Sequence, residues 1–256
     1  MNNMNIAVET MAAAAKTKNG NAYVTVKIHG DRGGRSIYLL AYGKGADTLI
    51  EKAKAAGTHL LVTDARYEIG DGKDKDGNTI RNFYIAGGMI QECPANLIVN
   101  SVCMTGRTVA DPRIATSGNG TVLCDARFAV ARPFARDTTD FVNTVAFDKT
   151  AKFMESYVKK GTKMELIGRL QTSSYDSQKL GRKVTDVTLI LNSVSFAESK
   201  NSSSGNSASA GADNYVNMAD GVMDVDSNTA AADAPMSDDL GELNDIDLDA
   251  IGLGDL

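Results

Sequence analysis

Four aromatic residues in the second half of this 256-residue chain stand close in sequence to basic residues. The aromatic residues are Phe134, Phe141, Phe147 and Tyr175, and the neighbouring cations are Arg132, Arg136, Lys149 and Arg169. A base can stack on an exposed aromatic ring and a cation can neutralise a phosphate, so the combination is typical of sites for single-stranded nucleic acid. Aromatic residues of a β-rich domain more often lie in the core. The pattern alone leaves both roles open.

Residues suited to catalysis or metal binding are few. The chain has two histidines and no H-E-x-x-H, Walker or G-x-S-x-G motif. Its three cysteines, Cys93, Cys103 and Cys124, lack the C-x-x-C spacing of zinc and redox sites, and we interpret them as reduced core residues. We therefore expect a protein that is not an enzyme and needs no cofactor or metal.

Charge is distributed unevenly along the chain. Residues 1–199 contain 26 bases and 20 acids, whereas residues 200–256 contain one base and 12 acids. A basic folded part commonly contacts polyanions, and an acidic tail poor in aromatic residues commonly stays solvated and binds partners. A tail that serves only solubility is the competing interpretation.

The tail itself divides into two segments. Residues 200–236 are rich in Ser, Asn, Ala, Gly and Asp, which predicts a disordered linker. Residues 237–256 place apolar residues among acids, which predicts a partner-docking segment. Its candidate partner-binding residues are Leu248, Ile251, Leu253, Asp255 and Leu256.

An internal repeat organises residues 1–199. The segment Tyr42–Ala46 aligns with Phe147–Ala151, and each is followed by apolar residues three and four apart, such as Ala151, Met154 and Tyr157, that predict a short helix. Around the second helix the patterns predict strands near 97–105, 121–132, 139–147, 163–175 and 182–196. The first copy is similar from Asn5 to Glu92, with a weak opening strand. Three strands, one helix and two strands is the order of an OB-fold, so we expect an all-β chain of two five-stranded Greek-key barrels, at 1–94 and 95–199.

An ordered series of motifs runs through the second copy. These segments are Asn100–Arg107 (NSVCMTGR), Phe128–Arg132 (FAVAR), Asp140–Asn143 (DFVN), Val145–Lys149 (VAFDK) and Gly168–Tyr175 (GRLQTSSY). Over residues 97–198 the series resembles the single-stranded DNA-binding protein (SSB) family of bacteria and phages. The resemblance implies stacking roles for Phe134, Phe141, Phe147 and Tyr175. We assign the other phenylalanines of this copy, Phe128, Phe153 and Phe196, to the core.

Seven cations of the second copy together predict a basic groove for phosphates, whereas each one alone fits a solvated surface charge equally well. Its candidate residues are Arg107, Arg132, Arg136, Lys149, Lys163, Arg169 and Arg182. The first copy departs further from the family, and we interpret it as a degenerate barrel whose best candidate binding residues are Tyr38, Tyr42 and Arg35.

The expected function is sequence-independent binding and protection of single-stranded DNA during DNA replication, recombination and repair, with partner proteins recruited by the tail. Family members usually end in Pro-Phe, whereas this chain ends in Gly-Leu-Gly-Asp-Leu256. Family members typically gather four barrels in one functional unit, so the resemblance and two barrels per chain imply a dimer. A homotetramer that uses only the second barrel for DNA is the alternative. No signal peptide or membrane span is evident, so we expect a cytoplasmic protein. An OB-fold scaffold for assembly or regulation that binds proteins is the alternative, and RNA is a third possible ligand.

Overall fold

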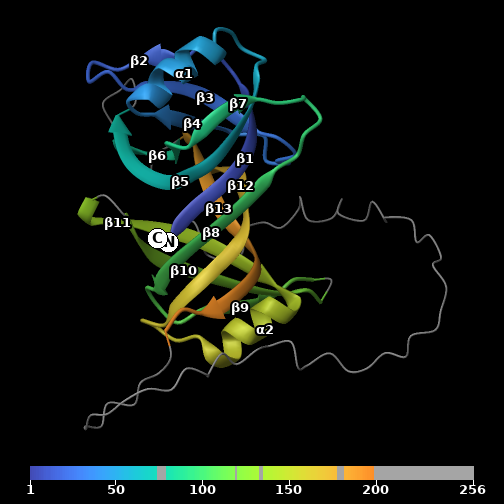
Figure 1. The fold of residues 1–256 in the computed structure, drawn as a ribbon. Helices are drawn as coiled ribbons and strands as arrows, with labels where there is room; N and C mark the ends of the chain where they lie inside the picture. The colour runs from blue at the N-terminus through green and yellow to red at the C-terminus, as the bar shows by residue number, and fades with distance from the viewer. Residues whose placement is uncertain (74–78, 119, 133–134, 178–181, 199–256) are drawn as a thin grey trace, which may run out of the picture. The chain divides into compact units, whose positions relative to one another are not determined.

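The computed structural model describes residues 1–198, except residues 74–78, 119, 133–134 and 178–181 (Figure 1). The first copy of the repeat contains β1 (Asn2–Thr10), β2 (Ala15–Lys16), β3 (Ala22–Ile28), β4 (Ser36–Ala41), α1 (Lys44–Lys52), β5 (His59–Lys73), β6 (Thr79–Ala86) and β7 (Met89–Glu92). The second contains β8 (Asn100–Thr108), β9 (Arg113–Thr116), β10 (Val122–Arg132), β11 (Ala135–Phe147), α2 (Asp148–Tyr157), β12 (Lys163–Ser177) and β13 (Arg182–Phe196). The predicted tail segments lie outside the described residues.

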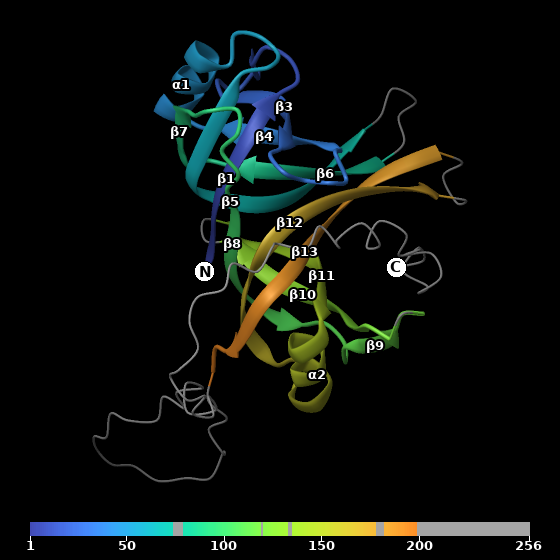
Figure 2. The ribbon, with the colours of Figure 1, turned by 90° about the vertical axis from the view of Figure 1, so that its right-hand side faces the viewer.

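Each copy closes into a five-stranded barrel. In the second copy β8 pairs with β10 and β12, β10 pairs with β11, β11 runs parallel to β13, and β13 pairs with β12. The first copy forms the same ring in the order β1, β3, β4, β6, β5 and back to β1. A helix follows the third main strand of each ring, as an OB-fold requires. The predicted fold class is confirmed, and Figure 2 shows β12 and β13 as two long curved strands side by side.

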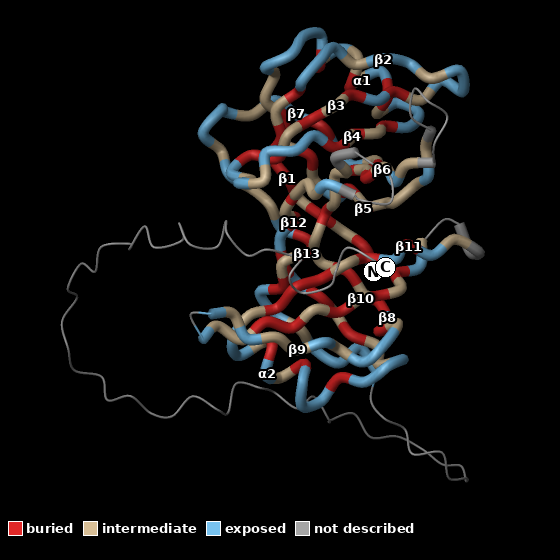
Figure 3. Tube along the Cα trace, turned by 180° about the vertical axis from the view of Figure 1, so that it is seen from behind, coloured by how far each residue is buried: buried red, intermediate tan, exposed pale blue. Residues whose placement is uncertain are grey.

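Alternation along the strands builds the two cores. On β3, Val24, Val26 and Ile28 point inward, while Tyr23 and the residues between them lie on the outer face. Ala46 and Leu49 of α1 are buried, as are Ala151 and Met154 of α2, because apolar residues three and four apart share one face of a helix. Figure 3 shows the buried residues along the strands.

The opening strand of the first copy is more fully buried and paired than its sequence predicts. Met4, Ile6 and Val8 of β1 are fully buried, and β1 pairs with β3, β5 and β8. Neighbours on both edges hold this strand, so it does not depend on a simple alternation of apolar and polar residues. Its pairing with β8 joins the two barrels, and the predicted division at residues 94 and 95 lies between β7 and β8 and stays a prediction.

Three of the predicted core positions are wrong. Phe196 is 50% exposed because it ends β13, and its ring contacts the tilted ring of Phe153, at 5.7 Å between centroids, beside the exposed Tyr157. Phe128 is fully buried and Phe153 packs partly buried against the core, as predicted. Cys124 is buried, but Cys93 and Cys103 are only partly covered, since Cys93 follows the last residue of β7 and Cys103 is on the outer side of β8.

Among the residues that the structure describes, neither helix is long and apolar enough to cross a membrane.

Candidate nucleic-acid interface

The outer face of β11 carries the best-exposed candidate platform. Strand alternation turns Asp140, Val142 and Thr144 inward, so Phe141 and its alternate neighbours face outward. Phe141 is 42% exposed, and the guanidinium of Arg127 on β10 lies over its ring at 5.1 Å from the centroid. A cation over an aromatic face holds the ring in place and adds positive charge where a base would stack. The sequence analysis did not name Arg127, although its place two residues before Ala129, the cross-strand partner of Phe141, is visible once the register is known.

Two further cations share a cross-strand row with Phe141. Lys163 pairs with Arg107, Arg107 pairs with Ala129, and Ala129 pairs with Phe141. Both cations bind Glu198, with Nζ and Nη2 each 2.8 Å from the same carboxylate oxygen, and these hydrogen bonds lower the pKa of Glu198. An exposed ion pair of this kind contributes little stability, so a phosphate can compete with Glu198 for both cations.

The charges that act on Arg127 come from both barrels. Burial lowers the pKa of Arg127, and the nearby charge of Arg81 on β6 lowers it further, while Asp186 on β13 opposes the shift. Asn143 donates a hydrogen bond of 3.4 Å to Asp186. The described face is therefore a cation and aromatic surface that contains one half-buried acid, Asp186.

A row of tyrosines crosses the outer face of the first barrel. Tyr38 on β4 lies 6.5 Å from Tyr23 on β3 and 5.7 Å from Tyr84 on β6, measured between ring centroids. Tyr38 and Tyr84 are cross-strand partners. Gly70 on β5 leaves room for the last ring, because a Cβ there would lie 3.0 Å from Tyr84 Cε2. The sequence analysis found Tyr38 but missed Tyr23 and Tyr84, which only the strand register brings together.

Tyr42 lies exposed just beyond β4, at the position that corresponds to Phe147. Partial burial raises the pKa of the Tyr42 hydroxyl, the charge of Glu68 raises it further, and Arg66 and Arg132 oppose the shift. Tyr42 is therefore protonated at neutral pH, close to charged groups of both barrels. Arg35 is also exposed, in the loop between β3 and β4.

The other predicted site residues are dispersed. Lys149 is exposed on α2, Arg169 is exposed on β12 with Nη1 3.1 Å from Gln171 Oε1, and Phe147 and Tyr175 are half-buried. Phe134 and the side chains of Arg136 and Arg182 lie outside what the structure describes.

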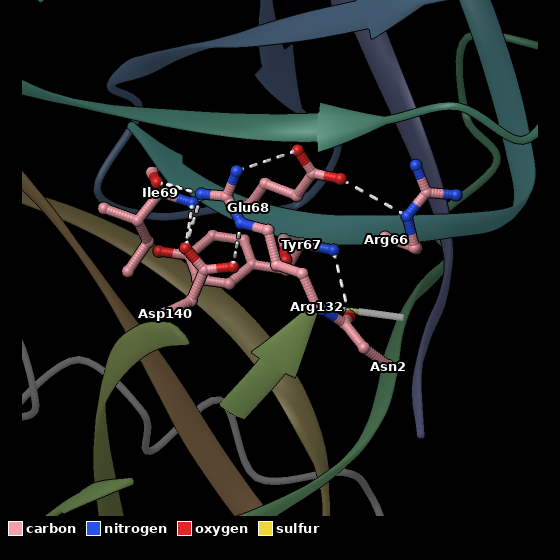
Figure 4. A network of polar contacts seen from close by, with 7 residues as sticks. All are labelled: Asn2, Arg66, Tyr67, Glu68, Ile69, Arg132 and Asp140. Carbon is pink, nitrogen blue, oxygen red and sulfur yellow. Dashed lines mark hydrogen bonds and ion pairs between the residues drawn. The ribbon is translucent and has the colours of Figure 1, made fainter. Parts of the chain in front are cut away.

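Arg132 is engaged inside the protein (Figure 4). Its Nε and Nη2 donate hydrogen bonds of 2.8 and 2.7 Å to the two carboxylate oxygens of Asp140, and Nη2 also donates to the carbonyl of Ile69. Its Nη1 lies 3.6 Å from Glu68 Oε2. The hydrogen bonds to Asp140 are the main cause of the raised pKa of Arg132.

Two closed barrels with aromatic and basic outer faces define an OB-fold protein of the kind that binds polyanions. The model of the single-strand binding protein family matches residues 99–197. A single-stranded DNA-binding protein of Fusobacterium nucleatum is 36% identical over 155 residues, which cover 58% of this chain and 97% of that protein. Single-stranded DNA-binding protein 1 of Staphylococcus aureus is 31% identical over 160 residues, which cover 59% of this chain and 99% of that protein. The chain belongs to the single-strand binding protein family.

The fold extends this likeness to both barrels. The crystal structure of the single-stranded DNA-binding protein from Thermus aquaticus matches with a TM-score of 0.58 and 17% identity, covering 82% of this chain and 97% of that one.

Proposed function

We propose that this protein binds single-stranded DNA without sequence preference, through the outer faces of both barrels. The observation that carries the proposal is the exposed ring of Phe141 beneath the guanidinium of Arg127, in one cross-strand row with Arg107 and Lys163. Stacking reads the face that every base shares, and cations read phosphates, so neither contact selects a sequence. The names of the relatives above agree with this ligand.

The first barrel contributes a second stacking surface. The row formed by Tyr23, Tyr38 and Tyr84 offers several aromatic faces on the strands that correspond to β10, β11 and β13. This row gives the first barrel a larger role than that of a degenerate barrel with Tyr38, Tyr42 and Arg35 alone. A strand of DNA long enough to reach both barrels then makes contacts that a short strand cannot make.

The wider biological role follows from this binding. The protein coats single strands exposed during DNA replication, recombination and repair, and its acidic tail recruits the proteins that act there. The rationale for the tail is its sequence, in which acids alternate with apolar residues.

A titration of fluorescent oligo-dT with the full-length chain tests the proposal, with duplex DNA of equal length as the control. We expect a preference for the single strand. We also expect the logarithm of the binding constant to fall by about 0.7 per neutralised phosphate for each tenfold increase in salt concentration.

Phe141→Ala should weaken binding by about 1–3 kcal/mol, the usual contribution of one stacked base. Tyr157→Ala removes a ring on α2 that is 63% exposed and takes part in none of the proposed contacts, and it should leave affinity unchanged. Equal binding of single strand and duplex would favour the protein-binding scaffold instead.

A further inference from the structure

Side chains supply hydrogen-bond partners to the backbone of β5 where its edge is not paired with another strand. Direct pairing of β1 with β5 reaches only as far as Met4 and Ala65. Beyond that point the Asn2 side chain takes the place of a neighbouring strand. It donates a hydrogen bond to the Tyr67 carbonyl at 2.8 Å and accepts one from the Tyr67 N–H at 3.1 Å. The N–H and C=O groups of an unpaired strand edge need partners, and the Asn2 side chain supplies them for Tyr67.

The next backbone pair on β5 is covered by the other barrel (Figure 4). The Ile69 N–H donates to Asp140 Oδ1 at 3.0 Å, and the Ile69 carbonyl accepts from Arg132. Asp140 is 2% exposed and Arg132 about one-fifth exposed, so this ion pair is largely shielded from water. An acid and a base of the second barrel together therefore bind one residue of the first.

The first barrel makes the reciprocal contact. On β12, the Asn100 side chain donates to the Leu170 carbonyl at 2.8 Å and accepts from the Leu170 N–H at 2.9 Å, as Asn2 does for Tyr67. The following outward backbone position belongs to Thr172, whose N–H lies 3.3 Å from both carboxylate oxygens of Asp31 and whose hydroxyl also donates to Asp31. Gly33 fits against the Thr172 carbonyl, since a Cβ there would overlap that oxygen.

The pairing of β1 with β8 has the same internal symmetry. The pair Asn2–Met104 at one end is matched by Ile6–Asn100 at the other, with Met4–Val102 at the centre. Such a register is what an isologous dimer interface shows when its two halves are fused in one chain. The contacts of Asp140 and Asp31 thus lie at corresponding places on either side of the joining strands.

We infer that Asp140 with Arg132, and Asp31 reciprocally, are positioning residues that fasten the two barrels and so align their outer faces for one strand of DNA. Arg132 acts in this contact, which we call the clasp, and does not bind a phosphate. The part of the inference that concerns DNA rests on the proposed function. The part that concerns the barrels does not, because the clasp is formed by protein groups alone.

The test compares two double variants of the full-length protein. Arg132→Ala with Asp140→Ala removes the clasp pair without leaving a buried charge unpaired. Arg113→Ala with Asp125→Ala removes an ion pair of 3.2 Å that joins β9 to β10 within the second barrel, and is the control with the same change of charge.

Hydrogen exchange resolved at individual amides is measured first. The Thr172 amide contacts neither of the substituted residues, so faster exchange there reports loosening of the two barrels. We expect this amide to exchange at least fivefold faster in the clasp variant than in the wild type. The Leu170 amide, held by Asn100 of its own barrel, should keep its rate in both variants. An unchanged Thr172 rate in the clasp variant would overturn the inference.

Binding of oligo-dT is measured second, at two lengths. About 10 nucleotides fit one barrel, and about 35 can reach both. We expect the clasp variant to lose roughly tenfold in affinity for the longer strand, because the second contact is no longer held in place, and to bind the shorter strand as the control does. An equal loss at both lengths would identify Arg132 as a direct DNA contact and overturn the inference. If the wild-type chain binds neither length, the proposed function fails, and the exchange of Thr172 still decides whether the clasp exists.

Discussion

Tyr38 is the central ring of the tyrosine row, and its position makes a specific demand on its chemistry. It contacts Tyr23 on one side and Tyr84 on the other, so a flat aromatic face is needed whereas the hydroxyl is not. We expect Tyr38→Phe to keep the affinity for a long oligo-dT, and Tyr38→Leu to lose about 1–3 kcal/mol. Fluorescence titration of both variants measures the difference, and equal affinities would show that the first barrel does not stack on DNA.

Asp186 is a half-buried acid on the cationic face. Its pKa is raised, and partial burial is the main cause. Hydrogen bonds from Val187 and Asn143 and the charges of Arg81 and Arg127 lower the pKa but do not cancel the effect of burial. The folded chain therefore holds the Asp186 proton more tightly than the unfolded chain does. This carboxyl favours folding in acid, and that contribution is lost as the pH rises through its raised pKa.

The substitution Asp186→Asn should remove this pH dependence. We expect the variant to gain stability over the wild type at pH 7 and to gain less at pH 4, because the folded wild-type carboxyl is protonated to a greater extent at the lower pH. Urea unfolding of both proteins at the two pH values measures the gain. A gain that is larger at pH 4 would contradict the raised pKa.

At the scale of elements, the loop between β3 and β4 must pass close to β12. Gly33 is the point of closest approach, and Gly33→Ala should destabilise the protein by about 1–3 kcal/mol, as overpacking usually does. Gly118→Ala is the control, since no atom lies within 4 Å of its added Cβ. Urea unfolding compares the two, and equal stability would mean that the loop moves away without cost.

The sequence predicts most of the elements and little of their contacts. Strand alternation and the internal repeat locate the strands and both helices, since these signals are local. Tyr23 and Tyr84 are too far apart in sequence for any local pattern to join them to Tyr38. The same holds for Arg132, whose partners Glu68 and Ile69 belong to the other barrel.

At the scale of the whole molecule, two fused barrels leave the outer face of the joining strands as a surface for a second copy. Ile167 on β12, Cys103 on β8 and Asn3 on β1 share one row of this face, and Ile167 is an exposed apolar residue. A face that carries internal twofold symmetry can pair with its own copy in an isologous contact. This favours the dimer of four barrels that the sequence predicts.

Sedimentation velocity over a range of protein concentrations tests the dimer. The chain mass is 27.1 kDa, so two chains give 54.2 kDa (2 × 27.1). We expect the dimer mass for the wild type and a shift toward monomer for Ile167→Glu, because the substitution places a charge in an apolar contact. Tyr157→Glu adds the same charge on α2 and should stay dimeric. A wild-type monomer at every concentration would exclude the dimer, whereas a mass of four chains would favour the tetramer.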